Sequence, residues 1–148
     1  MDRLSPNRRS WLMSRIRGKD TTPELIVRRL LHRLGYRYRL HHPRMPGKPD
    51  LVLKSRRKIV FIHGCFWHRH AGCRKATSPK SNQSFWQEKF EKNVARDEIA
   101  RLTLEAQGWD VLVVWQCETK DLEILERSLI TFLEAPVRDR KERQDRVS

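Results

Sequence analysis

Hydrophobic residues recur along the middle of the chain with two spacings, one typical of helices and one typical of strands. The helical spacing begins after Thr21 and Thr22, either of which can cap a helix, and Glu24 follows Thr21 at the distance of a capping box. Leucine and isoleucine then recur every three or four positions as far as Leu34, and Gly35 ends the pattern. These residues predict an amphipathic helix with one buried face.

The remaining pattern predicts four strands and two more helices. The alternating or continuous apolar segments that predict strands are residues 36–40, 50–53, 58–63 and 109–115. A long helix is predicted from Asn82 or Ser84 to Gln107, and a last helix from Lys120 to Glu134. Short links join the first three strands and a helical crossover leads to the fourth, so we predict an α/β fold with a mixed β-sheet and helices on its faces.

The length of 148 residues predicts one domain, which we place at 21–136. Residues 1–20 are predicted to be a basic N-terminal arm, and 137–148 a charged tail with too few apolar residues to build a core. No apolar run has the length of a membrane span, and the first residues do not resemble a secretory signal. With 3 cysteines, an odd number, the chain does not fit a disulfide framework, and we expect it in the cytoplasm.

The charge distribution points to an anionic partner. The net charge is +14, and residues 28–80 hold 15 basic residues with one acid, Asp50. A localised positive field of this kind favours nucleic acid, because each neutralised phosphate releases counterions. The alternatives are a solvated basic surface or adhesion to anionic lipid.

Cysteine and histidine lie close together in the segment 64–73, which reads G-C-F-W-H-R-H-A-G-C. Structural zinc prefers four nitrogen or sulfur ligands, and three cysteines with one histidine form a common set. Cys65, Cys73 and the distant Cys117 supply the cysteines. The spacing does not choose between His68 and His70 as the fourth ligand. The alternative is that these are ordinary buried cysteines near a histidine.

Two further features of the same region suggest chemistry on DNA. Asp50, the acid of the basic block, opens a strand where a carboxylate can hold Mg²⁺ for phosphodiester cleavage, although a plain turn aspartate would look the same. Phe66 and Trp67 lie among polar residues in a predicted loop, which favours apolar wedges at a base step over core side chains. For Phe61, Trp109 and Trp115, which fall in strands, we expect burial in the core.

Several motifs together resemble a known group of enzymes. A P-D dipeptide before an apolar strand, with Glu24 on the preceding helix, resembles the core of restriction-endonuclease-like nucleases. More closely, P-G-K-P-D, F-I-H-G-C-F-W-H-R-H, S-F-W-Q-E-K and K-N-V-A-R-D resemble the very-short-patch mismatch repair endonucleases, in order from about Arg8 to Cys117. The resemblance implies a restriction-endonuclease-like fold and a Mg²⁺-dependent enzyme. Such an enzyme nicks DNA 5′ of the thymine in a T·G mismatch, which arises when 5-methylcytosine deaminates.

The resemblance also implies roles for single residues. His68 matches the histidine that activates the attacking water, and Asp97 matches the carboxylate that orients it. Asp50 matches the Mg²⁺-binding aspartate, and His63 and Glu24 match a second active-site histidine and a supporting acid.

The remaining implied roles concern metal and DNA. The implied zinc ligands are Cys65, His70, Cys73 and Cys117, which assigns His70 to the zinc. The implied intercalating residues are Phe66, Trp67 and Trp86 from the major groove, and Met13 and Ile16 of the arm from the minor groove.

This sequence departs from the related patterns on the third predicted strand. The acid-x-Lys of restriction-like nucleases is absent, as it is in the repair subfamily, and Ile62 stands where that subfamily often has threonine. A backbone carbonyl at Ile62 can still bind Mg²⁺.

The expected partner is double-stranded DNA with a T·G mismatch, bound by a monomer near the nucleoid. Mismatch repair proteins and a DNA cytosine methyltransferase are further partners that the resemblance implies. The alternatives are a non-catalytic zinc module that binds distorted DNA and a restriction-like nuclease that cuts matched DNA. An RNA nuclease is the least favoured class.

Overall fold

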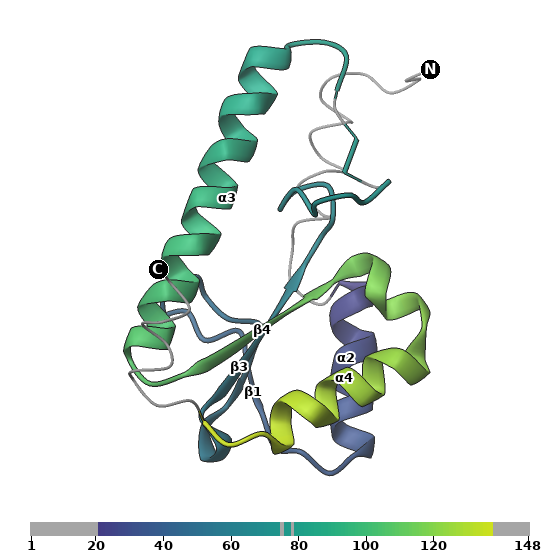
Figure 1. The fold of residues 1–148 in the computed structure, drawn as a ribbon, viewed down its shortest axis with the longest axis vertical. Coiled ribbons are helices and arrows are strands. Elements are labelled where there is room, and N and C mark those ends of the chain that lie inside the picture. The colour runs from purple at the N-terminus through teal and green to yellow at the C-terminus, as the bar shows by residue number, and fades with distance from the viewer. Residues whose placement is uncertain (1–20, 75, 78, 138–148) are drawn as a thin grey trace.

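The computed structural model describes residues 21–74, 76–77 and 79–137 (Figure 1). The predicted arm at 1–20, with Met13 and Ile16, and the tail beyond Val137 therefore lie outside the described residues. The helices are α2 (Thr22–Arg33), α3 (Gln83–Ala106) and α4 (Leu122–Glu134), with short 3-10 turns at Lys54–Arg56 and Gln116–Lys120. The strands are β1 (Arg39–Leu40), β2 (Leu51–Leu53), β3 (Lys58–His63) and β4 (Asp110–Trp115).

The four strands form one mixed sheet in the order β1-β2-β3-β4, which confirms the predicted fold class. The pairs β1–β2 and β2–β3 are antiparallel, and β3–β4 is parallel. The α3 crossover joins β3 to β4, as a parallel pair requires. Because β3 and β4 are parallel and in register from Lys58 opposite Asp110 to His63 opposite Trp115, their carboxyl ends lie side by side.

Helices cover the sheet unequally. On one face, α2 and α4 pack their leucines and valines on Leu51, Leu53, Val60 and Val114 (Figure 1). On the other face, Leu104 near the end of α3 packs with Val52, Ile59 and Phe61, beside the partly buried Trp109. The first half of α3 extends past the sheet (Figure 1), so it can carry polar side chains toward the ends of β3 and β4.

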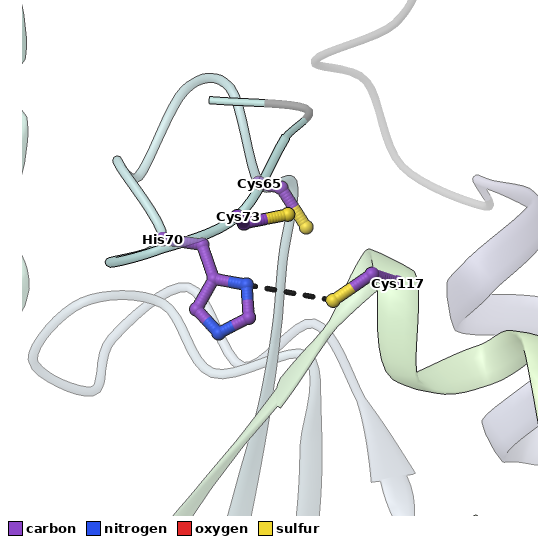
Figure 2. A group of neighbouring side chains, drawn as sticks. All are labelled: Cys65, His70, Cys73 and Cys117. Atoms are coloured by element: carbon purple, nitrogen blue, oxygen red, sulfur yellow. Dashed lines mark hydrogen bonds between the residues drawn. The ribbon is translucent and has the colours of Figure 1, made fainter. Parts of the chain in front are cut away.

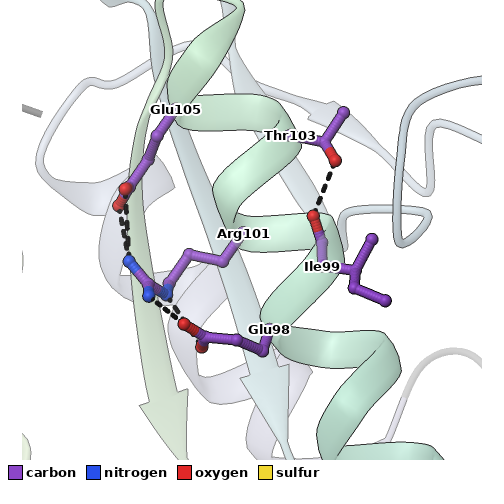
Figure 3. Close-up of polar contacts among 5 residues, drawn as sticks. All are labelled: Glu98, Ile99, Arg101, Thr103 and Glu105. Carbon is purple, nitrogen blue, oxygen red and sulfur yellow. Dashed lines mark hydrogen bonds and ion pairs between the residues drawn. The ribbon is translucent and has the colours of Figure 1, made fainter. Parts of the chain in front are cut away.

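Polar contacts link successive turns near the end of α3. Arg101 donates to Glu98 and to Glu105, with 3.1 Å to Glu105 Oε1, and the Thr103 hydroxyl donates to the Ile99 carbonyl at 2.7 Å (Figure 3). Pairs three and four residues apart face each other on a helix. These contacts support the last part of α3, where Leu104 packs on the sheet.

Two local predictions were wrong. The capping box at the start of α2 does not form: Thr21 is the N-cap residue but makes no side-chain cap bond, because Glu24 turns to His41 instead. The first strand is limited to Arg39–Leu40 instead of 36–40, because Tyr36 turns its hydroxyl to Glu134 at the end of α4.

No helix in the described ranges combines the length and the apolar character that crossing a membrane requires.

Candidate active site and metal centre

A cleft of about 720 Å³ opens beside the carboxyl end of β3. Its wall comes from five segments: the start of α2, the loop before β2, the end of β3 with the loop after it, the middle of α3, and Gln116 in the turn after β4. All five catalytic residues expected from the sequence line this cleft: Glu24, Asp50, His63, His68 and Asp97. Two exposed cations, Lys48 and Arg96, line it as well.

Asp50 lies at the junction of β2 and β3. Because these strands are antiparallel, the residue before β2 lies near the end of β3, and Asp50 Oδ2 accepts the backbone N–H of Ile62 at 2.7 Å. Burial raises the pKa of Asp50 to about 6, the Ile62 hydrogen bond opposes that rise, and the nearby Glu24 carboxylate adds to it. A half-buried acid with such a pKa is stabilised in its charged form by a neighbouring cation.

Glu24 is buried and has a partner that the sequence interpretation missed. Its Oε1 lies 2.5 Å from His41 Nε2, and its Oε2 lies 3.9 Å from Arg28. One ligand atom each from Glu24, His41 and Asp50 lies within 4.8 Å of the other two. The available signal was a histidine nine residues before Asp50, at the end of an apolar segment.

His68 and His63 lie against each other and line the same cleft as these acids. His68 Nδ1 is 2.5 Å from Asp97 Oδ2, so the loop histidine and the α3 carboxylate are paired. The rings of His63 and His68 stack with centroids 3.8 Å apart and planes 6° apart. Burial, together with the neighbouring His68, lowers the pKa of His63 to about 4, so His63 is neutral near pH 7.

The cysteines converge with His70 (Figure 2). His68 is paired with Asp97 instead. One ligand atom each from Cys65, His70, Cys73 and Cys117 lies within 4.8 Å of the others, and Cys117 Sγ is 3.4 Å from His70 Nδ1. Cys65 follows β3 and Cys117 follows β4 by the same offset, so the parallel register brings them together.

The donor set of this cluster suits zinc. Partial burial and the nearby Cys65 and Cys73 thiols raise the pKa of the Cys117 thiol to about 11. A bound cation reverses this by holding the thiolate form, and three sulfurs with one imidazole nitrogen complete a tetrahedral set. The ring of His70 stacks on Trp115 at 4.2 Å, which fixes its orientation.

Side chains from the loop after β3 and from α3 hold His68 and His70 in place. Arg69, between them, donates to the Thr77 carbonyl at 2.8 Å and the Ala76 carbonyl at 3.1 Å, and its guanidinium lies 4.1 Å from the Phe90 ring centroid on α3. The buried Asn93 amide donates to the Trp67 carbonyl at 3.3 Å. The residue before His68 is thereby tied to the helix that carries Asp97.

Aromatic side chains gather between the loop and the start of α3. Phe66 lies edge-on to Trp67 at 5.1 Å and to Phe90 at 5.2 Å, and Trp86 lies 6.0 Å from Trp67. Trp67 is buried, whereas Phe66 and Trp86 are partly exposed, and Phe66 and Trp67 both line the cleft. The exposed Phe85 next to Trp86 extends this cluster and was not singled out in the sequence. Of the three aromatic residues expected in the core, Phe61 is buried, whereas Trp109 and Trp115 are only partly buried.

The comparisons with known proteins agree on one family. The family model described as DNA mismatch endonuclease Vsr matches residues 1–75. A type II nicking enzyme, V.XorIIP of Xanthomonas oryzae pv. oryzae, is 53% identical over 90% of this chain and 97% of its own length. V.NmeAIP of Neisseria meningitidis, also named a type II nicking enzyme, is 45% identical over 86% of this chain and 91% of its own length.

A third relative carries the family's name. The DNA mismatch endonuclease Vsr of Escherichia coli is 38% identical over 83% of this chain and 78% of its own length. The chain thus belongs to the DNA mismatch endonuclease Vsr family.

Proposed function

We propose that this endonuclease nicks one strand of duplex DNA 5′ of the thymine in a T·G mismatch, by Mg²⁺-dependent hydrolysis, with one structural zinc. The observation that carries the proposal is the single cleft shared by Asp50, His63 and the His68–Asp97 pair. The residues beside this cleft can hold the phosphate, the water and a cation at once.

The acids and the end of β3 are suited to Mg²⁺. Magnesium prefers oxygen ligands and keeps several waters. Asp50 supplies a carboxylate, and because the N–H and C=O of one strand residue point to the same edge, the Ile62 carbonyl faces the Asp50 side. A backbone ligand at this position does not depend on the side chain, so isoleucine is compatible with it. Magnesium there would polarise the phosphate and lower the pKa of a bound water.

His68 is placed to remove the proton from the attacking water. With the Nδ1 proton directed to Asp97 Oδ2, Nε2 is left as a proton acceptor. The Asp97 carboxylate also stabilises the imidazolium that forms. Neutral His63, stacked behind His68, is suited to a hydrogen bond with the phosphate rather than to an ion pair.

Mismatch preference follows from the aromatic cluster. Inserting an apolar side chain into a base step costs roughly a few kcal/mol, and the cost is least where pairing is already weak. Phe66 and Trp86 are partly exposed beside the cleft, and Trp67 would require a loop movement to leave its buried position. We propose these three as the wedge from the major groove, with Met13 and Ile16 approaching from the minor groove.

The partners follow from the substrate. The relatives named nicking enzymes support cleavage of one strand, and the family name supports a mismatched duplex. We propose a monomer that acts at the nucleoid, with mismatch repair proteins and a DNA cytosine methyltransferase as functional partners. Since the chain belongs to an endonuclease family, a non-catalytic zinc module is not supported.

The test is a nicking assay with each strand of the duplex labelled in turn. A T·G duplex in Mg²⁺ should be cut only on the thymine strand, while the matched duplex stays intact and Asp50→Ala binds but does not cut. Equal cutting of the matched duplex would instead support the restriction-like alternative. Full activity of Asp50→Ala would reject the metal assignment.

Zinc content tests the structural site separately. The purified protein should hold about one equivalent of zinc, and Cys73→Ser should lose it. A folded wild-type chain without zinc would refute this part of the proposal.

A further inference from the structure

His41 lies with the two acids of the cleft, in a loop to which the motifs assigned no role. Its Nε2 is 2.5 Å from Glu24 Oε1, and its backbone N–H donates to the Asp50 carbonyl at 3.0 Å. The side chains of His41 and Glu24 are 17% and 3% exposed. Two carboxylates and one imidazole therefore converge within 4.8 Å in a largely buried position.

We propose that Glu24, His41 and Asp50 form a divalent-metal site of mixed oxygen and nitrogen ligands, which takes a first-row transition-metal ion in preference to Mg²⁺ when no DNA is bound. The inference rests on the proposed function, in which Asp50 is a metal ligand. It adds a nitrogen ligand, and the nitrogen changes which ion the site prefers.

The preference follows from ligand chemistry. Magnesium is a hard cation that takes oxygen and releases its waters reluctantly, so it gains little from an imidazole. First-row transition-metal ions bind imidazole well, and their affinity rises from Mn²⁺ through Co²⁺ to Cu²⁺. A site with His41 Nε2 beside two carboxylates therefore discriminates by ion type rather than by charge alone.

The backbone holds His41 where the site needs it. His41 has a φ of +46° and pairs with Asp50 through its N–H, while His42 donates to Pro49 at 3.2 Å, so the loop between them is closed at its base. Such preorganisation keeps a ligand in position before the metal arrives. His42 is the natural comparison, because its ring does not belong to the cluster and its Nδ1 is buried without a hydrogen-bond partner among the described residues.

Electron paramagnetic resonance with Mn²⁺ tests the proposal on the full chain with its zinc in place. Mn²⁺ is the weakest of its series and does not compete for thiolates, so binding by Mn²⁺ is a stringent probe. The wild type should bind one Mn²⁺ at this site with hyperfine coupling to a ligand nitrogen. Mg²⁺ should displace that Mn²⁺ only in excess.

The matched variants are His41→Asn and His42→Asn. Asparagine tolerates the left-handed backbone at position 41, so the first variant removes the imidazole with little strain. It should lose the nitrogen coupling and bind Mn²⁺ about tenfold or more weakly, since even outer-shell partners reach that range. His42→Asn should keep both. Unchanged zinc content in both variants confirms that each is folded.

Wild-type Mn²⁺ without nitrogen coupling, displacement by equimolar Mg²⁺, or unchanged coupling in His41→Asn would each overturn the proposal. If His41→Asn does not fold, ¹⁵N-histidine labelling of the wild type decides, because the coupling must change with the isotope. The Asp50→Ala nicking assay keeps the two levels apart. If Asp50→Ala loses nicking but Mn²⁺ in the wild type shows no nitrogen coupling, this inference alone is rejected. If Asp50→Ala retains nicking, the proposed function is rejected.

Discussion

Three histidines near the end of β3 carry the same side chain and differ in their neighbours. His63 is buried and stacked, His68 pairs with Asp97, and His70 lies among the cysteines. Burial favours the neutral imidazole, and a neighbouring carboxylate fixes its tautomer. A histidine among cysteines can bind a metal ion together with their thiolates. The environment, and not the residue type, therefore suits one to hydrogen bonding, one to proton transfer and one to metal binding.

Asp97→Asn tests the role of the carboxylate beside His68. The amide can present its NH₂ to Nδ1 and so favour the wrong tautomer, which should lower the single-turnover nicking rate by about two to four orders of magnitude, the range of general acid–base catalysis. DNA affinity by gel shift should change little. Glu98→Gln is the control, because the neighbouring Glu98 pairs with Arg101 and does not line the cleft. Equal rates in the two variants would contradict the assignment.

Gly47→Ala tests the packing of the loop that carries Asp50. A Cβ at Gly47 would lie 2.7 Å from Ala100 Cβ and 3.1 Å from Phe61, and its φ of +73° disfavours any side chain. We expect a loss of about 1–3 kcal/mol in unfolding free energy, measured by denaturant titration. Gly35→Ala has a similar φ of +85° and nothing within 4 Å, so it isolates the backbone term. A larger loss for Gly35→Ala would show that packing is not the cause.

Only part of the site was predictable from single residues. Asp50 stood out as the acid of a basic block, and the three cysteines suggested zinc without any structure. Spacing could not separate His68 from His70, because a two-residue offset in a loop fixes no direction. His41 was missed since its role depends on pairing with Glu24 across 17 residues, a contact that only the folded loop creates.

At the level of elements, the parallel pair β3–β4 positions both the candidate active site and the cysteine cluster. Two strands that end side by side place His63 next to Trp115 and bring Cys65 to Cys117. The α3 helix contributes to both the core and the cleft, with Leu104 in the core and Asn93 and Asp97 at the cleft. A shift of α3 along its axis would therefore disturb packing and catalysis together.

Asp110→Ala tests the buried ion pair that fixes the start of this strand pair. Lys58 Nζ lies 2.7 Å from Asp110 Oδ2, and both residues are buried. Removing the Asp110 carboxylate leaves the Lys58 charge buried without its counter-ion, so we expect a loss of about 3–5 kcal/mol in unfolding free energy.

The exposed pair Lys92–Glu88 on α3 is the comparison for this measurement. Both of its side chains are 69% exposed, and Glu88→Ala should cost less than about 1 kcal/mol in the same denaturant titration. Similar losses in the two variants would mean that burial does not control the cost.

Elements were predicted better than their ends. In the described ranges, the four strands and the amphipathic helices α2 and α4 follow from hydrophobic spacing, because their buried faces require it. The helix α3 is only weakly amphipathic, and its prediction depends on the residues at its two ends. The capping box failed since the local pattern at Thr21 competes with a tertiary partner, His41, that the pattern does not contain. Tyr36 likewise fits the alternating pattern of a strand, but its hydroxyl donates to Glu134 at the end of α4.

For the whole molecule, the excess of basic residues should appear as a salt-dependent affinity. Each neutralised phosphate contributes a slope of about −0.9 to the plot of log affinity against log salt. Lys48→Gln and Arg96→Gln, both at the cleft, should each reduce the slope by about one, whichever sequence is bound. Arg127→Gln on α4, outside the cleft lining, should leave it unchanged. Identical slopes in all three variants would place the DNA elsewhere.

The Cys65–Cys117 contact has a consequence for the unfolded chain. A metal bound there would link positions 65 and 117 through two metal–sulfur bonds and close a loop that contains all of α3 and β4. In the chain-entropy description of a crosslink, closing a loop of this size removes about 4 kcal/mol of unfolded-state freedom for as long as both thiolates stay bound to the metal. The zinc would thus act as a long-range staple, and the stability that it adds would be shared by the crossover helix and the sheet rather than confined to the loop that binds it.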